Sequence, residues 1–154
     1  MADARIVANR FLELAREGGR TLTPMQLLKL VYIAHGWTLA LLHRPLIPQR
    51  VEAWRYGPVI RDLYNATRAY GRAGVTLPIP VAFEPLRADE DDMIQQVYTL
   101  YGDLDGIALS NITHMPNTPW ADTYTSDEFG TVIDNNVIAA HYRRLAEERR
   151  NGAG

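Results

Sequence analysis

The segment from Pro24 to about Leu42 is apolar on nearly every side of the helix that it predicts. Thr23 can cap this helix, Pro24 stands at its first position, and Gln26 completes a capping box. Its apolar residues are Leu27, Leu28, Leu30, Val31, Ile33, Ala34, Trp37, Leu39, Leu41 and Leu42. A helix without a polar face belongs in the middle of a helical bundle. The sequence therefore predicts a fold built around this helix.

One narrow stripe interrupts the apolar surface of the central helix. Lys29, Tyr32 and Gly36 follow at i, i+3 and i+7, so they lie on one side of it. Two interpretations of the stripe stay open. In the first, Lys29 snorkels to the surface or pairs with a carboxylate, for which Glu52 is the expected partner across the core. In the second, the stripe is a half-buried contact site.

Further segments show helical patterns or helix start and stop signals. They cover about residues 4–16, 58–70, 88–101 and 106–114, and a last stretch that begins after Asp134. Asp105 and Asp134 can cap the last two helices, and the spacing of Leu100 places it on the buried face of the helix at 88–101. Residues 115–130 are expected to be irregular. Three prolines within residues 74–85 predict an extended loop there. Residues 147–154 are polar and glycine-containing, so we expect the C-terminal tail to fray.

A small β-ribbon is expected near residues 46–55, where apolar and polar residues alternate loosely. The pattern predicts short strands at Leu46-Ile47 and at Val51 to Arg55, joined by Pro48-Gln49. Gly57-Pro58 would then turn the second strand into a helix. The expected fold is therefore mainly α. It is a compact single-domain bundle of about five to six helices around residues 24–42, spanning residues 1–154 with a core of about 5–146.

Composition restricts the classes of function. The net charge of −2 offers no overall attraction to nucleic acid or to an anionic membrane, so we expect neither as a partner. The chain has no cysteine, which removes disulfides and thiolate chemistry and fits a reducing compartment. No signal-peptide pattern is present, and no apolar run approaches the roughly 20 residues that cross a bilayer. We therefore expect a cytoplasmic protein.

The sequence contains no assembled set of catalytic or cofactor-binding residues. None of the four histidines has the spacing of a helical zinc pair, and the glycines do not form a phosphate-binding loop. Ser110 lies four residues before His114 and near Asp122, but no glycine elbow surrounds the serine. We therefore predict no catalytic, cofactor-binding or metal-binding residues.

Several short motifs occur in an order and spacing that resemble the Panacea domain, also called the SocA-like family. They are Lys29-Leu30-x-Tyr32, Gly36-Trp37, Pro45-Leu46, Glu52-Ala53-Trp54-x-Tyr56-Gly57-Pro58-Val59, Thr113-His114 and Pro119-Trp120. The resemblance runs from about Val7 to Tyr142. It marks ten residues as a structural signature: Lys29, Tyr32, Gly36, Trp37, Glu52, Trp54, Gly57, Pro58, His114 and Trp120.

The resemblance implies a mainly helical, non-enzymatic antitoxin that neutralises a protein toxin by direct binding. The cognate toxin is expected from the adjacent gene, and phage and prophage genomes also carry such proteins. One branch of the family looks like a proteolytic adaptor that delivers its toxin to a ClpXP-type protease, which is an alternative function here. Many members carry an added DNA-binding segment. This chain begins almost directly with its first helix, so operator binding is not expected.

A second alternative starts from the residues rather than from the family. A lysine in an apolar helix can have a lowered pKa, and such groups often do chemistry. The enzymatic alternative is a small polar pocket formed by Lys29, Tyr32, Glu52, Tyr56 and His114. For binding rather than catalysis, the residues expected to touch a partner are Tyr56, Arg61 and Tyr64.

Overall fold

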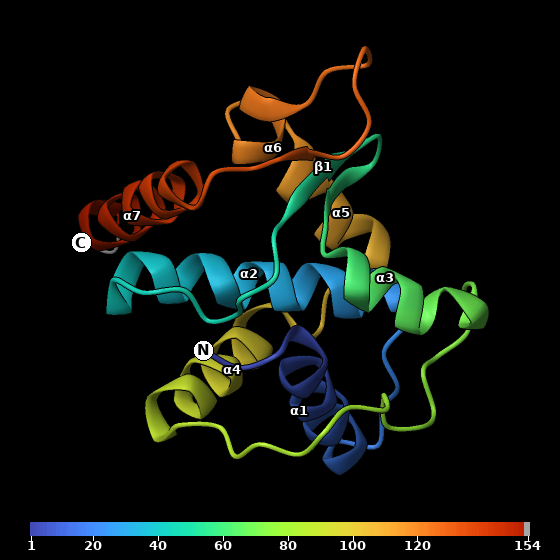
Figure 1. Cartoon of the computed structure of the whole chain (residues 1–154). Helices are drawn as coiled ribbons and strands as arrows, with labels where there is room; N and C mark the ends of the chain where they lie inside the picture. Colours follow the sequence, from blue (N-terminus) through green and yellow to red (C-terminus); the bar gives the residue numbers. More distant parts are fainter. Residues whose placement is uncertain (153–154) are drawn as a thin grey trace.

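Helix α2, Pro24–Leu42, runs through the middle of the molecule, with other helices around it (Figure 1). The structure is a computed structural model that describes residues 1–152. Within this range seven α-helices and a small antiparallel sheet form, which confirms the predicted mainly α fold. The helices in contact with α2 are α1 (Ala4–Glu17), α3 (Arg61–Thr67), α4 (Ala88–Tyr101), α5 (Gly106–His114) and α7 (Asn135–Gly152).

The start of α2 follows the predicted capping pattern. The Gln26 amide donates to the Thr23 hydroxyl at 3.2 Å, and the Thr23 amide donates to the Gln26 side chain at 2.9 Å. By length and mean hydropathy alone, α2 would be long and apolar enough to cross a membrane, so the expectation that no run approaches this length is wrong. However, 78% of its apolar window is buried inside the fold, as in the core helix of a bundle.

Local signals also start and stop other helices. Asp105 accepts from the Ala108 amide at 2.8 Å at the start of α5, and Asp134 accepts from the Asn136 amide at 2.7 Å at the start of α7. Residues 74–85 form the predicted irregular loop. Asn9 pins this loop to α1, because its side chain both donates to and accepts from the Ile79 backbone, at 3.0 and 2.7 Å.

The sheet differs in detail from the predicted ribbon. Its strands are β1 (Glu52–Trp54), β2 (Gly57–Val59) and β3 (Thr131–Val132), in the order β2-β1-β3. Residues 55–56 make a two-residue turn, and Gly57 at φ +123° follows it, so the chain folds back and Pro58 pairs with Ala53. The predicted strand at Leu46-Ile47 is absent from the described structure, and α3 begins at Arg61 instead of Pro58. Both Leu46 and Ile47 are buried in the core.

Three smaller features also depart from the sequence-based expectation. A short helix, α6 (Pro119–Thr123), forms in a segment predicted to be irregular, and the Thr118 side chain accepts from the Ala121 amide at its start. Leu100 of α4 is exposed, although its spacing placed it on the buried face. Helix α7 continues to Gly152 instead of fraying from residue 147, and its Arg149 guanidinium packs over the Trp37 ring. The last two residues of the predicted tail, 153–154, lie outside the described range.

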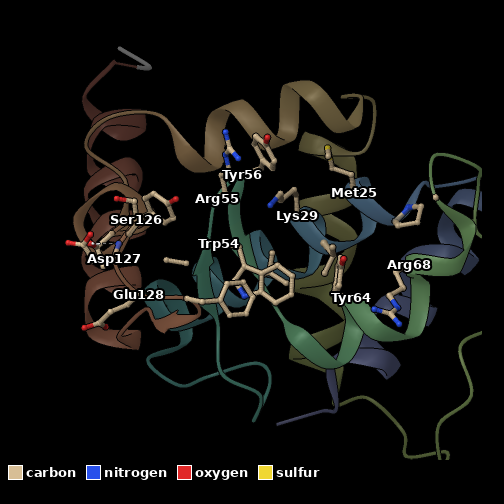
Figure 2. A pocket seen from close by; sticks show the side chains of 18 residues that line it. Met25, Lys29, Trp54, Arg55, Tyr56, Tyr64, Arg68, Ser126, Asp127 and Glu128 are labelled. Carbon is tan, nitrogen blue, oxygen red and sulfur yellow. Dashed lines mark hydrogen bonds between the residues drawn. The ribbon is translucent and has the colours of Figure 1, made fainter.

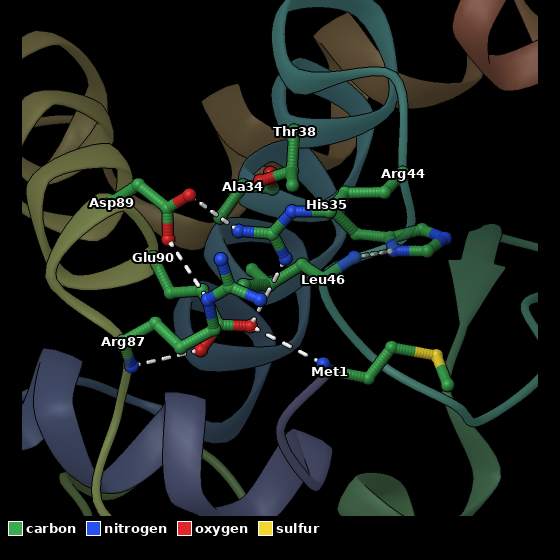
Figure 3. Close-up of polar contacts among 9 residues, drawn as sticks. All are labelled: Met1, Ala34, His35, Thr38, Arg44, Leu46, Arg87, Asp89 and Glu90. Atoms are coloured by element: carbon green, nitrogen blue, oxygen red, sulfur yellow. Dashed lines mark hydrogen bonds and ion pairs between the residues drawn. The ribbon is translucent and has the colours of Figure 1, made fainter.

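A buried carboxylate ties the segment after α2 to the start of α4 (Figure 3). Glu90 is 2% exposed and accepts from the Arg87 amide at 2.9 Å. Arg44 reaches Glu90 at 3.4 Å and Asp89 at 2.6 Å, and the Met1 amine lies 3.5 Å from Glu90. The Glu90 carboxylate is therefore both hydrogen-bonded and ion-paired, as a buried charge requires.

His35 lies at the centre of the same region and is held in one tautomer. Its Nδ1 accepts from the Leu46 amide at 3.3 Å, so Nε2 carries the proton and donates to Asn135 at 3.0 Å. Burial lowers the pKa of His35, so the ring is neutral at physiological pH. This contact links α2 to the first turn of α7.

Candidate functional site

A groove with a volume of about 700 Å³ opens beside the β1–β2 hairpin (Figure 2). We call it the hairpin groove. Its walls come from the first turns of α2, the hairpin, α3 with the following 3-10 turn η1 (Arg68–Tyr70), and residues 124–129. The large apolar and aromatic side chains that line it are Met25, Leu28, Trp54, Val59, Tyr56, Tyr64, Tyr124 and Phe129.

Trp54 is the centre of an aromatic wall in this groove. Its ring centroid lies 4.8 Å from that of Tyr64 and 4.9 Å from that of Phe129. The Trp120 indole nitrogen donates to the Trp54 carbonyl, which fixes the backbone beneath the wall. Phe129 is 72% exposed. The wall is therefore held at its base and open to solvent at its rim.

An ion pair behind the wall holds Trp54 in place. Arg61 donates to both carboxylate oxygens of Glu52, and the Trp54 indole nitrogen donates to Glu52 at 3.0 Å. The Arg61 guanidinium also lies 5.6 Å from the ring centroids of Trp54 and Phe129. The Arg61 hydrogen bonds lower the pKa of Glu52, so this carboxyl stays ionised. Glu52 and Arg61 therefore position the wall.

Lys29 lies at the floor of the groove and is 3% exposed. Its ammonium donates to the Pro58 carbonyl at 2.9 Å. No carboxylate within residues 1–152 lies within ion-pair distance of it, so the predicted Lys29–Glu52 pair is wrong. The turn at residues 55–56 places Glu52 opposite Val59, near the start of α3. There the Arg61 guanidinium binds the Glu52 carboxylate. Desolvation lowers the pKa of Lys29 to about 8.

Gly57 allows the hairpin to pass closely over Lys29. A Cβ at this position would lie 2.9 Å from the Lys29 Nζ and 3.6 Å from the His114 Cβ, and φ of +123° also favours glycine. The Ser110 hydroxyl donates to the Tyr56 carbonyl at 3.0 Å, so α5 secures the same turn. The predicted proximity of Ser110 and His114 is present, at 3.3 Å, but this serine hydroxyl holds the hairpin.

The structural-signature residues separate into two groups. Seven lie around the hairpin: Lys29, Glu52, Trp54, Gly57, Pro58, His114 and Trp120. The other three, Tyr32, Gly36 and Trp37, lie on the side of α2 that packs against α7, where they contact Tyr142. The Tyr32 hydroxyl is buried without a hydrogen-bond partner among the described residues, and burial raises its pKa.

The pocket of the enzymatic alternative does not form as one site. Of its five residues, only Lys29 and Tyr56 line the hairpin groove. Tyr32 packs against Tyr142, and Glu52 is bound by Arg61 and Trp54. Among residues 1–152, histidine and carboxylate side chains form no group of three that could hold a metal ion.

The expected partner-binding residues have different positions. Tyr56 and Tyr64 line the groove, and Tyr56 is 66% exposed at its rim, whereas Arg61 lies behind the wall. Met25, Arg68 and residues 124–129 also line this surface, although no sequence pattern predicted them there. An apolar Phe129 within a polar, irregular segment was the available signal, because an unpatterned aromatic residue has no evident place in a helical core.

Comparisons with known proteins agree with the motifs of this region. A family model described as "Antitoxin SocA-like, Panacea domain" matches residues 27–121. The chain is 30% identical over 129 residues to the curated protein "Antitoxin SocA" of Caulobacter vibrioides (strain NA1000 / CB15N), covering 77% of this chain and 68% of that protein. No solved structure matches the chain. The matched family region contains the hairpin and most of α2, and ends before residues 124–129.

Proposed function

Because the chain belongs to the SocA-like Panacea domain family of antitoxins, we propose that it neutralises a protein toxin by binding it directly through the hairpin groove. The observation that carries this proposal is the collection of exposed aromatic and methionine side chains at one opening. Met25, Tyr56 and Phe129 are 42%, 66% and 72% exposed there. Aromatic, methionine and arginine side chains are enriched at the centres of protein interfaces.

The proposed mechanism is occlusion, in which the antitoxin covers the active or target-binding surface of the toxin without catalysing a reaction. A specific interface of standard size buries about 1,600 Å² in total. The contact would therefore extend from the groove over its rim. Tyr56 and Phe129 are the aromatic anchors of this surface, while the Glu52–Arg61 pair keeps the wall in its binding conformation.

The proposed partner is the product of the adjacent gene, and the proposed place of action is the cytoplasm. A chain without cysteine fits a reducing compartment. Its net charge of −2 favours neither nucleic acid nor an anionic membrane as a partner.

Co-expression tests the proposal. The adjacent gene should arrest growth when induced alone, and growth should recover when this chain is expressed with it. The two purified proteins should also form a stoichiometric complex in size-exclusion chromatography. A harmless neighbouring gene, or rescue without any complex, would contradict direct neutralisation.

The same strains separate occlusion from delivery to a ClpXP-type protease. Under occlusion, the toxin accumulates in the complex at an undiminished level, and rescue persists in cells that lack the protease. Under delivery, the toxin level falls in the presence of this chain and rescue requires the protease.

A further inference from the structure

The charge at the floor of the hairpin groove is incompletely satisfied. An ammonium group has three donors, and the Pro58 carbonyl is the acceptor that Lys29 reaches in the described structure. Figure 2 shows the amine pointing toward the hollow between Trp54 and Tyr56. A buried charge is stable when it is both paired and hydrogen-bonded, so this position favours an anionic group from outside the chain.

The groove is also more positive than the chain as a whole. Its charged lining consists of three cations, Lys29, Arg55 and Arg68, and two anions, Asp127 and Glu128, which leaves one net positive charge. The whole chain carries −2. Asp127 and Glu128 are exposed, so solvent screens them, whereas the Lys29 charge acts in a drier environment.

The side chains around Lys29 favour an anion that is joined to an apolar group over a small free anion. Trp54 lines the same groove as Lys29, and its ring packs against the exposed Phe129 ring, so an apolar group adjoining the anion would have an aromatic surface to cover. A small carboxylate would fill the floor and leave this rim uncovered. A protein segment could contact both.

We propose that the occupant of the groove is a short toxin segment that presents a carboxylate beside an apolar side chain. The carboxylate pairs with the Lys29 ammonium, and the apolar side chain lies against Trp54 and Phe129. This inference rests on the proposed function, because it names the chemistry of the toxin surface that the antitoxin binds.

The sequence offers a direct spectroscopic test, because Lys29 is the only lysine in the chain. Protein grown with ¹³C-labelled lysine gives one lysine side-chain signal, and its pH titration reports the pKa of this one amine. Saturation with the purified toxin should raise that pKa by about one unit or more, because a carboxylate stabilises the charged form. An unchanged or lowered pKa in the complex would overturn the inference.

Binding measurements supply the second part of the test. Lys29→Met keeps the apolar stem and removes the charge, and it should weaken toxin binding about tenfold or more. Arg150→Met removes one exposed positive charge from the end of α7, away from the groove lining, and should leave the dissociation constant within about twofold. If Lys29→Met does not fold, the titration of the wild-type complex still decides.

The partner carboxylate can then be identified on the toxin. Changing this carboxylate to the amide should weaken toxin binding as much as Lys29→Met does. The two changes together should weaken binding by less than the sum of their separate effects on the binding free energy. Amidation of the toxin C-terminus distinguishes a terminal carboxylate from a side chain, and either result supports the inference. Tight binding that is insensitive to Lys29 would overturn the inference and leave direct neutralisation standing. Absence of wild-type binding would remove both proposals.

Discussion

Arg61 holds Glu52 through two hydrogen bonds, from Nη2 to Oε1 at 2.7 Å and from Nε to Oε2 at 3.1 Å. Glu52 is the carboxylate that the sequence predicted as the partner of Lys29, and in the structure it is bound by Arg61 instead. The Lys29 ammonium is left with a backbone carbonyl, at the floor of a groove with an aromatic wall. The pairing of Glu52 with Arg61 therefore both supports the wall and leaves Lys29 without a carboxylate partner among residues 1–152.

Replacement of Glu52 should destabilise the fold before it changes specificity. Glu52→Ala removes the acceptor of both Arg61 and Trp54 at a site that is 9% exposed, so we expect a loss of about 1 to 2 kcal/mol in the free energy of unfolding. Urea denaturation measures it. Glu13→Ala, which removes an exposed surface carboxylate, is the control and should change little. A Glu52→Ala protein as stable as the wild type would contradict this structural role.

Truncation of the exposed wall residue should affect binding more than stability. Phe129→Ala should weaken toxin binding about tenfold, because an exposed aromatic anchor is lost while the core stays intact. Phe83→Ala is the matched control, since Phe83 is 88% exposed and lies outside the groove lining. Calorimetric titration compares the two variants. A loss for Phe129→Ala no larger than that for Phe83→Ala would contradict the place of Phe129 in the binding surface.

Gly36 should resist even the smallest substitution. An alanine Cβ there would lie 2.3 Å from the Tyr142 ring, so Gly36→Ala should destabilise the fold by about 1 to 3 kcal/mol despite the better helix propensity of alanine. Gly18→Ala is the control, because its nearest neighbour would be 3.6 Å away and its φ is −88°. The midpoint temperature of thermal unfolding should fall for Gly36→Ala and stay unchanged for Gly18→Ala. A Gly36→Ala protein as stable as the wild type would require Tyr142 to move without cost.

Lys29 should make the free energy of unfolding change with pH in the alkaline range. Its folded pKa of about 8 lies below the ordinary value of 10.5, so the unfolded chain binds more protons between these values and stability rises with pH across that window. The full rise is about 3 kcal/mol. The charged or titratable groups that line the groove with Lys29, or lie beside Gly57 above it, are Arg55, Tyr56, Tyr64, Arg68, His114, Tyr124, Asp127 and Glu128.

The comparison with Lys29→Met isolates this effect from the other titrating groups. The difference in unfolding free energy between the two proteins should change across about pH 8 to 10.5 and level off outside that window. Denaturant titrations at several pH values measure it. A constant difference would mean that Lys29 is not desolvated in the folded protein.

The local elements could be predicted from the sequence because their signals involve neighbouring residues. The capping box of Thr23 and Gln26 and the apolar surface of residues 24–42 predicted α2 and its central place. Asp105 and Asp134 predicted the starts of α5 and α7 in the same way. Motif order and spacing further predicted the family.

The tertiary structure decided the hairpin register, the partner of Glu52 and the groove. Residues 55–56 form the turn, so Gly57 and Pro58 belong to a strand. In this register Arg61 binds Glu52, and Lys29 donates to the Pro58 carbonyl instead. The groove joins the start of α2 to residues 124–129, which are about a hundred positions away along the chain. These contacts join residues that are far apart along the chain or lie across a strand register, and patterns of neighbouring residues do not encode them.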